Sequence, residues 1–139
     1  MSVLLDTNIV SELRKGERAD ARVRAWFATQ PEADIHLSVL VIGELRRGVE
    51  RVRARDARQA EALERWLQRL TRLHADRILP VDARVADEWG RFSARRNASP
   101  IDVLMAATAR AHQLTLVTRN TRDVAWTGVA HLNPFERPN

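Results

Sequence analysis

Four acidic residues stand where the predicted strands and helices of this chain end or begin. Asp6 directly follows the apolar residues 3–5, and three further acids, Glu44, Asp102 and Asp123, occur much later. Two carboxylates about 6 Å apart repel each other by roughly 3 kcal/mol at an effective dielectric constant of ~20. A hard divalent cation such as Mg²⁺ or Mn²⁺ relieves that repulsion, because it prefers carboxylate oxygen and keeps waters that can become nucleophiles. These residue types therefore predict metal-assisted chemistry, provided that the fold brings them together.

Short, mostly apolar runs that alternate with helical patterns are expected to position these acids. The runs are typical of strands at residues 3–5, 35–37, 78–81, 114–118 and 129–132, and Pro80 favours an edge position for the third. Strand and helix alternate with connections long enough for crossovers. We therefore predict an α/β fold: a single-domain α/β/α sandwich over residues 1–139 with a central parallel sheet of about five short strands. The carboxyl ends of such strands share one edge, where ligands bind in open α/β sheets.

The predicted helices start at or near the same edge. A short helix is expected at residues 9–13, and a longer one, which carries Glu44, follows the second strand. Pro100 at the first helical position marks the start of the helix that carries Asp102. Residues 50–76 are charged and periodic, with one apolar stripe, which predicts a helical hairpin arm.

Each acid also has an ordinary structural explanation. Asp102 can stabilise a helix start by about 0.5 to 1 kcal/mol through the terminal N–H groups and the helix dipole. Asp123 can be a turn residue, and Glu44 can pair with the arginine three positions on, which is worth roughly 0.2 to 0.5 kcal/mol. Asp6 is the strongest functional candidate, because a carboxylate next to a buried strand loses hydration and Thr7 could cap the following helix without it.

Composition restricts the classes of protein that remain. The chain has 139 residues, 45% of them hydrophobic, which is enough for one compact core. It lacks cysteine, so disulfides, thiolate catalysis and cysteine-based zinc sites are excluded. No apolar run reaches the ~20 residues of a membrane span and no secretory pattern opens the chain, so we expect a soluble, cytoplasmic protein with no membrane partner. The net charge of +5 fits a nucleic-acid or acidic-protein partner, and an arginine-rich genome explains it equally well.

Four blocks of the sequence resemble the PIN-domain family. They are residues 4–8, Ser38 with residues 43–48, Ile101 and Asp102 with residues 106–109, and residues 117–120 with Asp123. Because their order and spacing cover essentially the whole chain, the resemblance is far more specific than any one block. Within the family the chain is most similar to VapC-type toxins of bacterial toxin–antitoxin pairs, including the FitB-like branch.

The resemblance implies a Mg²⁺- or Mn²⁺-dependent ribonuclease, an endonuclease that hydrolyses RNA phosphodiester bonds and acts as the toxin of a type II pair. Its catalytic and metal-binding quartet falls on Asp6, Glu44, Asp102 and Asp123. The family's supporting polar positions, which orient the acids or contact metal-bound water, fall on Thr7, Asn8, Thr118 and Asn120. The resemblance also implies a homodimer and a small antitoxin that inserts a segment across the acidic groove and carries a DNA-binding region.

Two departures distinguish this chain from the family's pattern. Val124 stands where many relatives carry phenylalanine, so Asn120 is an alternative to Asp123 as the fourth member of the quartet. The segment 95–100 lacks the glycine and apolar residues often found before the helix of Asp102, so we expect a loop of different shape there.

The basic and aromatic residues are candidates for RNA contacts and for packing. The candidates for holding the RNA backbone are Arg46, Arg47 and Arg119, and a solvated helix face explains the first two equally well. The four tryptophans are assigned to the core or to a dimer contact rather than to base stacking, because three of them lie on helical apolar stripes. The four histidines show no spacing typical of metal ligands.

Two other functions compete with the nuclease. A haloacid-dehalogenase-like phosphatase also has a strand that ends in aspartate, but its chemistry wants a second aspartate two residues on, where this chain has Asn8. A catalytically degenerate RNA- or partner-binding module would keep the fold without the reaction. A metal-dependent shift in thermal unfolding distinguishes that module from an enzyme that binds a divalent ion.

Overall fold

The centre of the fold is a sheet of short parallel strands. The computed structural model describes residues 1–136, so residues 137–139 of the predicted domain lie outside the described part. The strands are β1 (Val3–Leu5), β2 (Ile35–Ser38), β3 (Ile78–Leu79), β4 (Thr115–Val117) and β5 (His131–Leu132). They lie in the order β3-β2-β1-β4-β5, and every neighbouring pair is parallel. The predicted fold class is confirmed, and β3 has the edge position that Pro80 indicated.

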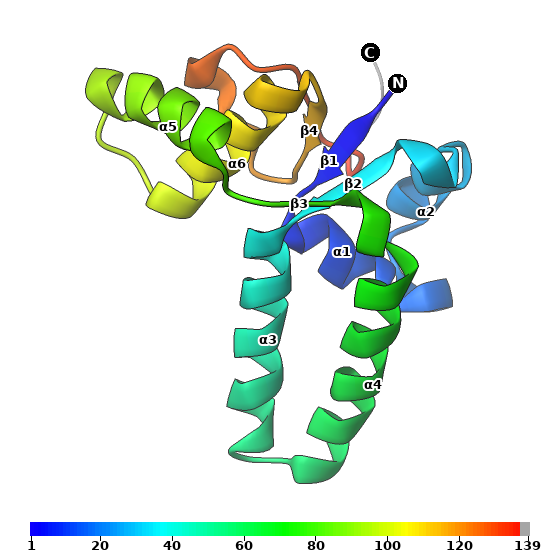
Figure 1. Ribbon diagram of the computed structural model, residues 1–139. Coiled ribbons are helices and arrows are strands. Elements are labelled where there is room, and N and C mark those ends of the chain that lie inside the picture. The colour runs from blue at the N-terminus through cyan, green and yellow to red at the C-terminus, as the bar shows by residue number, and fades with distance from the viewer. Residues whose placement is uncertain (137–139) are drawn as a thin grey trace.

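Helices cover both faces of this sheet. The α-helices within residues 1–136 are α1 (Thr7–Leu13), α2 (Ala21–Ala28), α3 (Val39–Arg53), α4 (Ala57–Leu73), α5 (Ala83–Arg95) and α6 (Pro100–His112). Figure 1 shows α5 and α6 on one side of the strands and α1 and α2 on the other. None of these helices is long and apolar enough to cross a membrane.

The direction in which strands are added to the sheet reverses beside β1. The chain runs outward from β1 to β2 and β3, and then returns to place β4 on the other side of β1. This reversal between β1 and β4 is the topological switch point at which open α/β sheets bind ligands. The three residues of β1 are buried, and directly after them the backbone N–H of Asp6 donates to the carbonyl of Val117 at 2.9 Å. Asp6 therefore leaves the sheet at its carboxyl edge, next to the end of β4.

The hairpin arm is longer than predicted. It consists of α3 and α4, which lie side by side and extend away from the sheet (Figure 1), so it starts at Val39 rather than at residue 50. Ser38 caps α3, since its hydroxyl accepts the backbone N–H of Leu40 at 3.0 Å. The helix then continues through Gly48, because packing against α4 outweighs the roughly 1 kcal/mol that an interior glycine costs. Asp56 caps α4 and completes the turn.

Candidate active site

Asp6 is both a candidate catalytic acid and the N-cap of α1. Its Oδ1 accepts the backbone N–H of Thr7 at 2.8 Å, and its Oδ2 accepts the hydroxyl of Thr118 at 2.7 Å. Thr7, which the sequence allowed as an alternative cap, does not cap this helix. Because Asp6 is the cap, α1 begins at Thr7 and not at Ile9, as the sequence had indicated. Both carboxylate oxygens are thus held in place by donors from two different elements.

The environment of Asp6 disfavours its negative charge. Burial raises the pKa of this carboxyl above its ordinary value, the hydrogen bonds from Thr118 and Thr7 lower it in part, and the charge of Glu44 raises it further. The net direction is upward. A carboxylate held in this way is stabilised by any cation that approaches it.

Glu44 reaches the same place from α3. The hydroxyl of Thr7 donates to its Oε1 at 2.6 Å, and the guanidinium of Arg47 lies 3.7 Å from its Oε2. Thr7 therefore joins two of the predicted acids, because its backbone N–H binds Asp6 and its side chain binds Glu44. The predicted surface pair between Glu44 and Arg47 is present as well, although at 3.7 Å it is a long one.

Asp102 lies in the first turn of α6. Pro100 opens this helix as predicted, while Ser99 occupies the cap position without a side-chain hydrogen bond. Burial raises the pKa of the Asp102 carboxyl first, and the charges of Asp6, Asp123 and Glu44 raise it further. The carboxyl of Asp102 therefore interacts electrostatically with all three of the other acids. This electrostatic coupling is the strongest sign that the four gather at the carboxyl edge of the sheet.

Asp123 lies in the short 3-10 turn η4 (Thr121–Asp123), which follows the loop after β4. It shares a cavity of about 310 Å³ with Asp102, and Asn120 does not line that cavity. The backbone N–H of Asn120 instead donates to the hydroxyl of Thr118 at 3.1 Å. Of the two alternatives for the fourth acid, Asp123 is the better placed, and its role stays a prediction.

Asn8 links Asp6 to the loop after β4 through its side-chain hydrogen bonds. Its side-chain amide is 3.4 Å from the hydroxyl of Thr118 and 3.5 Å from Oδ2 of Asp6, and its Oδ1 accepts the backbone N–H of Arg119 at 3.2 Å. Thr118 itself is buried. The predicted supporting residues Thr7, Asn8 and Thr118 therefore all contact an acid or a residue that holds one.

The donor set fits a divalent cation that is held by few direct ligands. All four candidate ligands are carboxylates, which Mg²⁺ and Mn²⁺ prefer. Within the part of the chain that the structure describes, no three acidic or histidine side chains form a ready-made metal site. Mg²⁺ commonly binds through one or two carboxylates together with waters and substrate phosphate. Which of the four carboxylates would hold such an ion stays a prediction.

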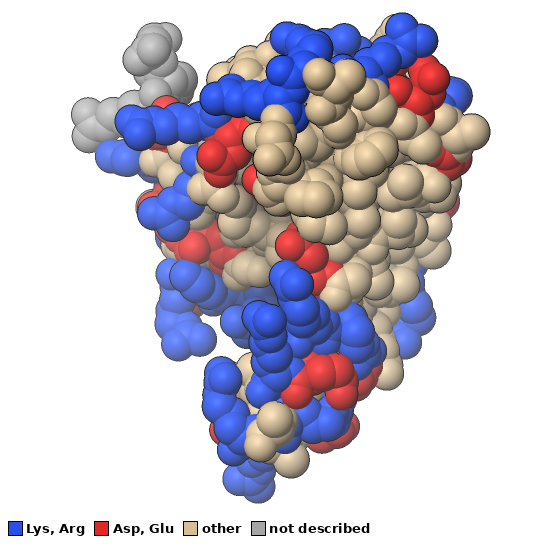
Figure 2. Space-filling model, turned by 90° about the vertical axis from the view of Figure 1, so that its left-hand side faces the viewer, with Lys and Arg blue, Asp and Glu red and all other residues tan. Residues whose placement is uncertain are grey.

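All three arginines predicted to hold RNA have other partners, and that of Arg47 is Glu44 at 3.7 Å. Arg46 binds both oxygens of Glu64 at 2.6 Å each and Glu50 at 3.0 Å. The guanidinium of Arg119 lies 4.4 Å from the ring centre of Phe135. Figure 2 shows blue and red side chains next to each other over the lower part of the molecule, where the arm lies. The positive charge of the arm is therefore partly neutralised from within.

Two arginines that the sequence analysis did not select line the cavity of Asp102 and Asp123. They are Arg96, from the loop before α6, and Arg122, from η4. The signal that could have found Arg96 was the unusual segment 95–100, whose arginines replace glycine and apolar residues. Arg122 carried no such signal.

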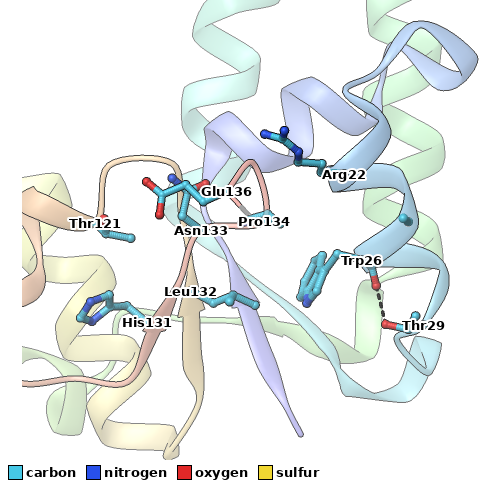
Figure 3. Close-up of a pocket in the computed structure, with 10 residues that line it drawn as sticks. Arg22, Trp26, Thr29, Thr121, His131, Leu132, Asn133, Pro134 and Glu136 are labelled. Atoms are coloured by element: carbon cyan, nitrogen blue, oxygen red, sulfur yellow. Dashed lines mark hydrogen bonds between the residues drawn. The ribbon is translucent and has the colours of Figure 1, made fainter. Parts of the chain in front are cut away.

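A larger cavity lies away from the acids, between α2 and the segment that follows β5. Its volume is about 830 Å³, and Figure 3 shows Trp26 facing Leu132 and Pro134 across it. None of the four predicted acids lines it. Its chemistry therefore does not match the one that the quartet predicts.

The small parallel α/β fold, with candidate acids near its switch point, is that of the PIN-domain family, and the chain belongs to this family. The family described as PIN domain matches residues 3–126. The chain is 36% identical to the protein Toxin FitB of Neisseria gonorrhoeae, over 96% of this chain and 98% of that one. It is 32% identical to the protein VapC ribonuclease Y4jK of Sinorhizobium fredii, again over 96% of this chain and 98% of the relative.

Solved structures agree with this assignment. The crystal structure of FitAcB from Neisseria gonorrhoeae contains a chain that is 32% identical, with a TM-score of 0.87 over 97% of this chain and 99% of that one. The structure of FitAB bound to an IR36 DNA fragment contains one that is 29% identical, with a TM-score of 0.88 over 99% of this chain and 98% of that one. The predicted resemblance to the PIN-domain family, and to its FitB-like and VapC-type members, is confirmed.

Proposed function

We propose that this chain is a divalent-metal-dependent endoribonuclease and the toxin of a type II toxin–antitoxin pair. The observation that carries the proposal is the geometry near the switch point of the sheet, where Thr7 binds both Asp6 and Glu44 and where Asp102 and Asp123 line one cavity. Likeness over nearly the full length to a toxin and to a VapC ribonuclease supports it. The haloacid-dehalogenase-like alternative is set aside, because the chain belongs to a different family.

In the proposed mechanism, neighbouring residues hold the side chains of Asp6 and Glu44 in fixed orientations. Thr118 and the backbone N–H of Thr7 each fix one oxygen of Asp6, while the Thr7 side chain holds Glu44. A bound Mg²⁺ or Mn²⁺ supplies two things at such a site, a water of lowered pKa and a positive charge beside the phosphate. Asp6 and Asp102 would bind the ion, with Glu44 and Asp123 acting directly or through water.

The proposed partners follow from the relatives. FitAB and FitAcB are assemblies in which a similar chain occurs, one of them with DNA. We therefore propose that this chain forms a homodimer and binds a small antitoxin that carries a DNA-binding region. The antitoxin would insert a segment across the acidic groove and block the access of RNA to Asp6 and Asp102.

Cleavage of total cellular RNA with mapped ends tests the nuclease. The wild-type chain is expected to cut in Mg²⁺ or Mn²⁺ and not in chelator, and Asp6→Asn is expected to lower the rate by about 100-fold or more, since even residues that only support a metal ligand contribute 10- to 100-fold. The matched control is Asp76→Asn, because that carboxylate is 81% exposed and remote from the site. A folded Asp6→Asn chain that cuts at the wild-type rate would refute the assignment.

A catalytically degenerate binding module is the remaining alternative. It predicts that RNA is bound but not cut under any metal condition. The same experiment therefore decides between the two, provided that binding of the RNA is measured alongside cleavage.

A further inference from the structure

The cavity that contains Asp102 and Asp123 has walls of opposite charge. The two carboxylates come from α6 and η4, and Arg96 and Arg122 line the same space of about 310 Å³ together with Trp126. This volume lies at the lower end of the roughly 300 to 1,000 Å³ typical of small-ligand sites. A cavity of this size is large enough for one sugar-phosphate unit.

Arg96 and Arg122 form no ion pair with Asp102 or Asp123, although all four residues line the same cavity. Neither Arg96 nor Arg122 takes part in an ion pair within residues 1–136. Both side chains are exposed. Arg46 on the arm is the opposite case, since it is paired with Glu64 and Glu50. The donors of Arg96 and Arg122 are therefore available to a ligand.

Trp126 holds Arg96 in a defined place. The guanidinium carbon of Arg96 lies 5.5 Å from the ring centre of Trp126, within the range of a cation–π contact. The indole is itself fixed, because its N–H donates to the carbonyl of Asp123 at 3.0 Å and its ring meets Phe92 edge-on with centres 6.1 Å apart. A guanidinium stacked on a fixed ring keeps its planar N–H groups free and oriented.

We propose that Arg96 and Arg122 form a phosphate-binding subsite that holds the RNA strand beside the acidic cluster, with Trp126 as the positioning residue for Arg96. This inference rests on the proposed function and names the contacts to its substrate. The guanidinium fork matches the oxygens of a phosphate in a bidentate way. Trp126 serves this subsite as a support for arginine and not as a platform for a base.

Salt-dependent RNA binding tests the subsite without the reaction. The probe is a short, fluorescently labelled single-stranded RNA of mixed sequence, and chelator prevents cleavage. Each arginine that contacts a phosphate contributes about 0.7 to the slope of log K against log salt concentration for single strands. Arg96→Ala and Arg122→Ala are each expected to lower the slope by about that amount and to weaken binding several-fold at low salt.

The control and the positioning role need separate variants. Arg24→Ala removes an equally exposed arginine on α2, far from the cavity, and is expected to leave the slope unchanged. Because Arg95 also lies over this ring, at 5.8 Å, Trp126→Leu is expected to weaken RNA binding in the wild-type background and to have no further effect in a background that carries both Arg95→Ala and Arg96→Ala. A purely structural tryptophan would weaken both backgrounds equally, which would overturn its positioning role. Circular dichroism and thermal unfolding establish that each variant is folded.

The outcomes separate the subsite from the nuclease. If folded Arg96→Ala and Arg122→Ala bind RNA with the wild-type affinity and slope, or if Arg24→Ala has an equal effect, the subsite is refuted while the nuclease stands on its own cleavage assay. If both variants behave as expected but the wild type never cuts RNA in Mg²⁺ or Mn²⁺, the subsite stands and the nuclease is refuted.

Discussion

At the scale of single residues, Asp6 is both the N-cap of α1 and a candidate metal ligand. As an N-cap it accepts a backbone N–H, a contact worth typically about 1 kcal/mol to a helix. Its pKa is nevertheless raised, because burial and the charge of Glu44 outweigh the hydrogen bonds from Thr118 and Thr7. The cap explains why the carboxylate is held rigidly, and the raised pKa explains why a cation would stabilise it.

Thr7 is predicted to matter through Glu44. Thr7→Val keeps the backbone N–H that binds Asp6 and removes the hydroxyl that donates to Glu44 at 2.6 Å. We expect RNA cleavage to fall about 10- to 100-fold, the usual effect of removing a residue that orients a metal ligand. The matched control is Thr71→Val, whose hydroxyl donates to a backbone carbonyl of α4. Equal rates for both variants would show that Thr7 does not position Glu44.

Asp102 is predicted to destabilise the metal-free protein at neutral pH. Its folded pKa lies above the ordinary 3.8, so the unfolded chain loses its proton first and stability falls as pH rises through the folded value. Asp102→Asn removes this cost, and we expect the free energy of unfolding in chelator to rise by less than about 1 kcal/mol, because the group is largely screened by solvent.

The pH dependence provides the check on this prediction. Below about pH 3.8 the wild-type carboxyl is protonated in both states, so the gain of Asp102→Asn should disappear there. Denaturant unfolding at several pH values measures it. A variant that is less stable than the wild type at neutral pH would show that the favourable field at the start of α6 outweighs burial and repulsion.

At the scale of elements, charged contacts flank the apolar contacts that close the distal part of the arm, where Val49 of α3 and Ala60 of α4 are buried. Arg53 of α3 binds Glu61 at 2.6 Å and Glu64 at 3.0 Å, both on α4, and Arg46 binds Glu64 with two parallel hydrogen bonds. The hydrogen bonds from Arg46 contribute most to lowering the pKa of Glu64, which falls to about 2. Such a network adds to the apolar packing in orienting α4 relative to α3.

A double-mutant cycle on Arg46 and Glu64 tests this network. We expect a coupling energy of about 1 kcal/mol, the upper end for partly exposed pairs, because the contact is bidentate. The control pair, Arg91 and Asp87 of α5, is single and exposed, and should give roughly 0.3 to 0.5 kcal/mol. Arg46→Ala is also expected to cut RNA at close to the wild-type rate. A large loss of cleavage without coupling would favour a direct RNA contact instead.

At the scale of the whole molecule, the sheet order gathers the site. Asp6 and Thr118 are 112 positions apart in the chain, yet a hydrogen bond of 2.7 Å joins their side chains because β4 lies beside β1. α3 and α6 then bring Glu44 and Asp102 to the same edge. A site assembled from four separate segments depends on the fold as a whole, so metal binding and global stability should be linked.

Metal binding is therefore predicted to stabilise the entire domain. A ligand that binds only the folded state at a hundredfold excess over its Kd raises the free energy of unfolding by about 2.7 kcal/mol. We expect Mn²⁺ to raise the melting temperature of the wild type relative to chelator, and Asp6→Asn to lose most of that shift. Asp76→Asn should keep it. No shift in the wild type would favour a binding module that does not use metal.

Part of this structure could be predicted from short segments of the sequence. The strand at residues 3–5 was predictable because burial on both faces leaves a continuous apolar run, and the start of α6 because Pro100 has the backbone geometry of a first helical turn. The extent of the arm could not be predicted, because Gly48 lowers the local helix propensity and only the packing of α3 on α4 supports the helix there. The choice of Asp6 over Thr7 as the cap depended on where β1 ends, and both residue types are good caps.

The sequence by itself determined the residue types of the candidate site and their order, since carboxylates, threonines and asparagine occur in blocks typical of one family. Only the tertiary structure decided which of these residues touch. It joined Thr7 to Glu44 and Thr118 to Asp6, and it paired Arg46 with Glu64 while placing Arg96 against Trp126. The physical reason is that such contacts depend on strand order and helix packing, which are properties of the whole chain and not of any local segment.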